Sequence, residues 1–158
     1  MANIPAAQRG IFVHHPDSMT PAVVHYPEGD SQSFAAGDEG VPSSGKLVAY
    51  TQDSDGQVFA IAGRDANNNT ANSDLLAWLW TPSTFFEMPL STTNSESTAT
   101  SAASNEGVIY GFNVDDLGYG FLDPAETTTA NLRGRVIKLI DAAGTIAGRA
   151  IVQPVLIA

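Results

Sequence analysis

The sequence contains no cysteine and few basic residues. The absence of cysteine excludes a disulfide framework, a thiolate zinc site and a cysteine nucleophile. Lysine and arginine together number 7 against 17 aspartate and glutamate residues, so the formal net charge is −10. Binding to nucleic acid requires a basic surface that neutralises phosphates, and docking on an anionic membrane has the same requirement. We therefore expect neither a nucleic acid nor a membrane among the partners of this protein.

Long apolar runs are also missing. A helix needs about 20 apolar residues to cross a bilayer, whereas the longest apolar clusters, at 75–80 and 152–158, have the length of a strand. The first ten residues carry one arginine and no apolar run long enough for the core of a signal peptide. The sequence therefore predicts neither a transmembrane helix nor a secretory signal.

The composition is that of a globular protein with few charges. Of the 158 residues, 43% are hydrophobic and 15% are charged. A chain of this length buries roughly 68–70% of the surface that its unfolded form exposes, so it can form a core without disulfides. We expect one domain with at most a small appendage.

Residues 1–30 are predicted to form an extended arm. They hold four of the nine prolines, and proline breaks helices and removes a backbone donor from sheets. The arm also carries apolar residues that need a partner surface. Two interpretations remain open: the arm packs on its own domain, or it reaches a neighbouring subunit. For the second interpretation, the contact residues are Ile11, Phe12, Val13 and Tyr26.

Residues 31–158 are predicted to form a body of short strands. Apolar runs recur there at the spacing of strands and are separated by turn residues, and helical patterns of 10–15 residues are absent. The clearest signal is an Asp-Gly turn within 53–56, which predicts a hairpin between 46–51 and 57–62. The predicted fold is mainly β, an antiparallel short-stranded barrel or sandwich.

One segment of the body has a biased composition. Serine and threonine make up 9 of the 14 residues of 91–104. Such a segment has no apolar periodicity with which to build a core, so we predict a flexible loop.

Motifs for catalysis, cofactors and metals are not apparent. There is no G-x-S-x-G elbow, no glycine-rich phosphate loop and no pair of carboxylates in a recognisable catalytic spacing. The adjacent His14 and His15 would point to opposite sides of an extended segment, and no H-x-H or H-x-x-x-H spacing occurs. We predict no metal site, no cofactor and no enzymatic activity.

Trp78 and Trp80 alternate along a predicted strand, so their side chains would share one face. Such a pair forms either an aromatic platform for a sugar or part of a core or subunit interface. We assign the pair to self-association and keep the sugar platform as an alternative.

Positive charge is concentrated near the end of the chain. Residues 1–106 carry twelve acids and three bases, a net charge of −9, whereas residues 107–158 carry five acids and four bases, a net charge of −1. These bases either keep strand edges solvated or form a contact surface for an acidic patch on a neighbouring subunit. The four bases of the second part are Arg133, Arg135, Lys138 and Arg149.

Several stretches share a pattern with a known group of proteins. They include a Gly-Asp-Ser-Gln-Ser-Phe opening at 29–34 and a Gly-Val-Ile-Tyr-Gly-Phe strand at 107–112. The further stretches are 47–50, 54–58, 121–123, 135–141 and 148–152. Together they resemble the small capsid decoration, or cement, proteins of tailed bacteriophages, in which a β-rich body ends in a C-terminal hairpin.

The resemblance implies a non-enzymatic structural protein of the virion. It would be made in the host cytoplasm and would sit on the capsid exterior as a homotrimer. Its partner would be the major capsid protein, whose adjacent subunits it would cement, with the N-terminal arm reaching across capsomers. The alternative is a carbohydrate- or receptor-binding β module on a virion or cell surface.

Overall fold

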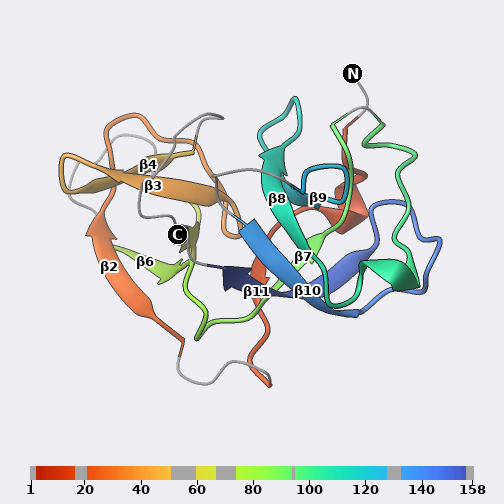
Figure 1. Cartoon of the computed structure of the whole chain (residues 1–158). Coiled ribbons are helices and arrows are strands. Elements are labelled where there is room, and N and C mark those ends of the chain that lie inside the picture. The colour runs from red at the N-terminus through yellow and green to blue at the C-terminus, as the bar shows by residue number, and fades with distance from the viewer. Residues whose placement is uncertain are drawn as a thin grey trace.

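The computed structural model describes residues 3–16, 21–50, 60–66, 74–93, 95–127 and 133–155. These residues form two antiparallel sheets that lie beside each other in Figure 1, in a sandwich-like arrangement without a closed barrel. Within the described residues, the helical elements are two single 3₁₀ turns, η1 (Ala6–Gln8) and η2 (Ala103–Asn105). The prediction of a mainly β, antiparallel fold is confirmed, and of its two options the structure favours the sandwich.

Sheet A has six strands, and most of them come from the second half of the chain. Their spatial order is β1-β7-β11-β10-β8-β9. The C-terminal strands β10 and β11 pair directly, with Arg135 opposite Gln153. The bounds are β1 (Phe12–Val13), β7 (Phe86–Pro89), β8 (Ile109–Val114), β9 (Gly120–Asp123), β10 (Arg133–Leu139) and β11 (Arg149–Val155).

Sheet B has five strands in the order β2-β6-β5-β3-β4. Its central strand β5 is buried along its whole length, which explains why this segment reads as a continuous apolar run rather than an alternating one. The bounds are β2 (Val23–Pro27), β3 (Glu39–Ser43), β4 (Lys46–Ala49), β5 (Ala60–Ala62) and β6 (Asp74–Leu79).

The predicted hairpin between 46–51 and 57–62 is wrong in its pairing. The strand β4 does begin at Lys46, but it pairs with β3, which lies between β4 and β5. The turn that joins β3 to β4 consists of Ser44 and Gly45, both with positive φ (50° and 79°). A two-residue turn in which both φ angles are positive has a backbone twist that matches the right-handed twist of the flanking strands. The predicted turn at 53–56 lies outside the described residues.

Both faces of sheet B are covered. Along β5 the side chains alternate, so Ile61 joins the core shared with sheet A, whereas Ala60 and Ala62 join a second cluster on the other face of sheet B. The shared core also contains Val41 of β3 and Phe86 of β7. Apolar contact between the sheets therefore fixes their relative position.

Each sheet curls until distant strands meet. In sheet A, Leu90, just after β7, forms a parallel bridge with Leu122 of β9. In sheet B, Glu28, just after β2, forms one with Leu47 of β4. Glu28 is fully buried there, and the guanidinium of Arg64 lies 3.5 Å from its carboxylate. Curling turns one face of each sheet inward and provides room for these buried side chains.

The N-terminal arm packs on both sheets of its own chain. Residues 3–16 lie on sheet A, where β1 pairs with β7 and where Ile4 and Ile11 have no exposed surface. Residues 21–28 belong to sheet B, where β2 pairs with β6. Of the two interpretations of the arm, packing on its own domain is the one that this structure displays.

The serine- and threonine-rich segment forms no regular strand or α-helix in the parts that the structure describes, 91–93 and 95–104. It is nevertheless tied to the body. The amide of Ser91 donates to the carbonyl of Leu122. The amide of Ser101 donates to the carbonyl of Thr145, and Thr100 forms an antiparallel bridge with Ile146, both in the loop after β10. Ser91, Glu96 and Ser101 are buried. The flexibility of this segment stays a prediction.

Candidate functional site

The structure separates the predicted arm residues by their exposure. Ile11 is fully buried, Val13 and Tyr26 are partly buried, and 47% of Phe12 is exposed. Val13 packs against the core shared by the sheets, and Tyr26 packs against the cluster inside sheet B. Of these four residues, Phe12 therefore has the largest exposed fraction left for a partner.

The ring of Phe12 lies against two glycines and an arginine. A Cβ on Gly10 or Gly37 would come within 2.7 and 2.9 Å of the Phe12 ring, respectively. Both glycines have φ near +90°, a conformation that disfavours other residues. The guanidinium of Arg149 lies 5.5 Å from the ring centroid, within the range of a cation–π contact. One face of the ring is thus fixed while part of it stays open to solvent.

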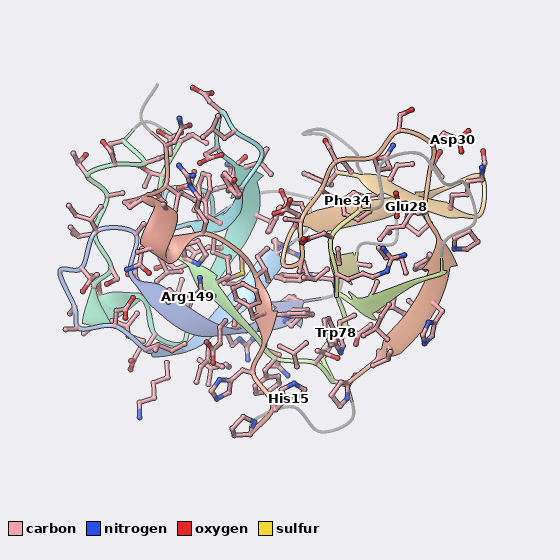
Figure 2. The ribbon with its side chains drawn as sticks, turned by 180° about the vertical axis from the view of Figure 1, so that it is seen from behind. His15, Glu28, Asp30, Phe34, Trp78 and Arg149 are labelled. Carbon is pink, nitrogen blue, oxygen red and sulfur yellow. The ribbon has the colours of Figure 1, made fainter. Side chains whose placement is uncertain are left out.

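The two tryptophans do not form an exposed pair. Trp80 is only 6% exposed and stacks on Phe86, with ring centroids 5.1 Å apart. Its indole N–H donates to the carbonyl of Arg133. Trp78 is partly buried and packs against the same core, close to the junction of the sheets (Figure 2). Trp80 is thus a core residue, and its burial leaves no two-ring platform at the surface, whereas Trp78 keeps part of its surface exposed. Self-association through this pair stays a prediction.

Four of the seven basic residues contact other groups of the same chain. Arg149 donates to the carbonyls of Gln8, Gly10 and Glu87, at 2.7–2.9 Å, and lies within the lobe of sheet A (Figure 2). Burial lowers the pKa of Arg149, although the charges of Glu87 and Asp141 oppose that shift. The other engaged bases are Arg9 on the Tyr119 ring, Lys46 with Asp30, and Arg64 with Glu28.

The three remaining bases lie on β10. Arg133 is half-buried, whereas Arg135 and Lys138 are exposed, and none of them has a hydrogen bond or ion pair to another described side chain. The sequence grouped Arg149 with these residues, but the structure turns Arg149 inward. We call these three side chains uncommitted, because the described side chains offer them no hydrogen-bond or ion-pair partner. All three lie on one strand.

A β-bulge shapes the surface of this strand. The pairing with β11 shifts between Val136 and Lys138, so Ile137 is the extra residue and the alternation of side chains is broken. As a result Ile137, at 37% exposure, and Lys138 are both at the surface. Together with Arg135 they form what we call the β10 face, an apolar side chain between two cations.

A pocket of about 180 Å³ lies where the two sheets meet. Sheet B contributes the start of β3, the end of β4 and the segment before β3, and sheet A contributes the turn between β8 and β9. The described residues that line the pocket are Ser33, Phe34, Asp38, Glu39, Ala49, Tyr50, Leu117 and Gly118.

Glu39 is the most unusual group in this pocket. The residue is only 4% exposed, and its Oε2 atom has no hydrogen-bond partner among the described residues. Burial raises the pKa of Glu39 well above its usual range, nearby backbone N–H groups partly offset this, and Asp38 and Asp115 add to it. Gly120 makes the room, because a Cβ there would lie 2.9 Å from Oε2.

Sequence reasoning missed both Glu39 and the bulge at Ile137. Glu39 stands in an ordinary polar stretch, and its burial depends on a turn of the other sheet. The bulge is set by pairing with β11 and leaves no local signal. No cluster of three metal-ligating side chains occurs among the residues that the structure describes. Within those same ranges no helix is long and apolar enough to span a membrane.

Comparison of the chain with protein-family models, with curated proteins and with solved structures found no match.

Proposed function

We propose that this chain is a structural protein that decorates the outer surface of a tailed-phage capsid and cements adjacent major-capsid subunits. The observation that carries the proposal is the β10 face, where the uncommitted cations of a protein with a net charge of −10 are gathered around an exposed isoleucine. A basic and apolar surface of this kind suits an acidic patch on a partner, because complementary charges set orientation and exclude wrong partners.

The order of strands also supports the proposal. The resemblance to decoration proteins implies a late strand followed by a C-terminal hairpin. In this chain β8 contains the Tyr110-Gly111 pair of that late strand, and β10 and β11 form the hairpin. The β10 face stands on a strand that pairs with β11 from Arg133 to Leu139 and with β8 from Arg133 to Arg135.

A decoration protein acts by linkage. A ligand that binds only the assembled shell stabilises it by RT ln(1 + [L]/Kd), and many copies act together on one lattice. Several protein–protein contacts per copy serve this purpose, so we also expect a homotrimer with head-to-tail contacts that close into a ring. Phe12 would add a second contact at the β1 edge of sheet A.

The proposal is tested by co-sedimentation with shells assembled from the cognate major capsid protein. Reversing both charges in an Arg135→Glu/Lys138→Glu variant should weaken binding at least tenfold, since two attractive contacts become repulsive. Lys46→Glu, which reverses one charge on sheet B, is the matched control for the single variants Arg135→Glu and Lys138→Glu. Equal binding of wild type and the double variant would overturn the β10 face as the contact. Lack of wild-type binding, together with binding to a glycan array, would favour the carbohydrate-binding alternative.

A further inference from the structure

We propose that the pocket between the sheets binds a cationic side-chain group, an alkylguanidinium or alkylammonium, which meets the carboxyl group of Glu39. This inference does not depend on the proposed function. It rests on a buried carboxyl oxygen without a described partner, at the wall of a pocket of about 180 Å³.

The chemical groups that line the pocket favour a cation as its ligand. Asp38 and Glu39 both face the pocket, and the described lining contains no lysine, arginine or histidine. A buried polar atom without a partner is destabilising unless a ligand satisfies it. An N–H donor that also carries positive charge supplies the missing hydrogen bond and offsets the carboxyl charge.

The size and walls of the pocket favour an alkyl cation over a bare ion. The described residues offer no group of three side chains that could hold a metal. A volume of about 180 Å³ exceeds that of an apolar cavity known to hold benzene, about 150 Å³. Phe34 and Leu117 are apolar members of the lining, against which the methylene stem of arginine or lysine can pack while its charged end meets Glu39.

The pKa of Glu39 supports this assignment. Burial raises it, and Asp38 before β3 and Asp115 after β8 raise it further. A positive charge beside the carboxyl group would favour its ionised form and reverse that shift. Binding of a cation in the pocket and ionisation of Glu39 would therefore favour each other.

The group could come from a second copy of this chain or from a different protein. A second copy offers the exposed cations of its β10 face, Arg135 and Lys138. The two sources share the same chemistry, so the experiment first tests the pocket with a free probe and then identifies the donor.

The first measurement is a titration of the ¹⁵N-labelled full chain with N-acetyl-arginine amide, followed by NMR. We expect saturable shifts at Gly118 and Gly120, with half-saturation on the order of 1 mM for so small a ligand. The citrulline analogue, which has nearly the same shape without the charge, should bind at least tenfold more weakly. No saturation, or equal binding of the two probes, would overturn the proposal.

Two variants locate the binding at Glu39. Glu39→Gln keeps the shape of the side chain and should weaken probe binding at least tenfold, whereas Glu106→Gln makes the same change at an exposed residue before β8 and should have no effect. Ala49→Tyr blocks the entrance from an exposed position of β4 and should weaken binding without altering a buried group. Binding that survives both Glu39→Gln and Ala49→Tyr would contradict the assignment.

The second measurement is sedimentation velocity over a range of concentrations. If the donor is a second copy, self-association should weaken to the same extent in Glu39→Gln and in Arg135→Gln/Lys138→Gln, and excess arginine amide should compete. If the wild type binds the probe but its self-association does not respond to these variants, the donor is a different protein. Shell binding is measured separately, so failure of the pocket and failure of the decoration role are distinguishable.

Discussion

The guanidinium of Arg149 lies 5.5 Å from the centre of the Phe12 ring, so the last strand of the chain supports the first. The same guanidinium donates to the carbonyls of Gln8 and Gly10, both at 2.9 Å, and to that of Glu87 at 2.7 Å. One side chain therefore joins the N-terminal arm, β7 and β11. The position of the arm depends on this residue.

Replacing Arg149 should loosen the arm. Arg149→Leu leaves three carbonyls without their charged donor, and we expect the free energy of unfolding to fall by about 2–4 kcal/mol. Arg149→Lys keeps the charge but not the planar set of donors, so its loss should be smaller. Urea denaturation measures both, and Arg135→Leu on the exposed face of β10 is the control. A loss in Arg149→Leu no larger than in the control would contradict this role.

Phe12→Ala should lower the stability only a little but weaken the binding to shells. Because 47% of Phe12 is exposed, we expect only about 1 kcal/mol of lost stability, well below the roughly 3–5 kcal/mol of a fully buried phenylalanine. If Phe12 contacts the capsid, the affinity for shells should fall although nearly all of the variant remains folded. Thermal unfolding and co-sedimentation of the same variant make the comparison. Phe86→Ala, in the core, is the matched change for stability.

The raised pKa of Glu39 predicts a pH dependence of stability. The folded protein holds the proton more tightly than the unfolded chain, so stability falls as the pH rises above the ordinary glutamate value of about 4.3. Glu39→Gln cannot ionise, so its stability relative to wild type should increase as the pH rises from 4 to 7. The pKa of Asp38 is also raised, mainly by burial, and contributes with the same sign.

Chemical denaturation of wild type and Glu39→Gln between pH 4 and pH 8 measures this difference. Glu106→Gln, which makes the same change at an exposed residue, serves as the control. A gap between wild type and Glu39→Gln that does not widen with pH would show that the buried carboxyl group is not the cause.

The hairpin of β3 and β4 should accept a better turn. Ser44 has φ of 50° and is followed by Gly45 at 79°, and asparagine tolerates this conformation better than serine does. Ser44→Asn should raise the free energy of unfolding by about 0.5 kcal/mol, whereas Gly45→Ala should lower it by about 1 kcal/mol. Gly45→Ala touches little else, because a Cβ on Gly45 meets no atom within 4 Å, and Ser44 is exposed. Opposite signs in thermal unfolding are the expected result.

The strand positions were largely predictable, because they follow from local patterns. The apolar runs at 46–51, 57–62, 75–80, 107–112 and 135–140 each overlap a strand of the structure. Pairing was less predictable. An Asp-Gly turn suggested that the first two runs are neighbours, but β3, with its Pro42, was not recognised as a strand and lies between them.

The sequence by itself determined the class of fold, the acidic charge and the grouping of bases near the C-terminus, since alternation, turn residues and charge are local or additive properties. Only the tertiary structure decided which bases stay uncommitted, because the inward turn of Arg149 depends on carbonyls of the distant arm and of β7. The burial of Glu39 was likewise decided by Gly120 of the other sheet. Contacts between segments far apart in the chain leave no trace in the residues around either partner.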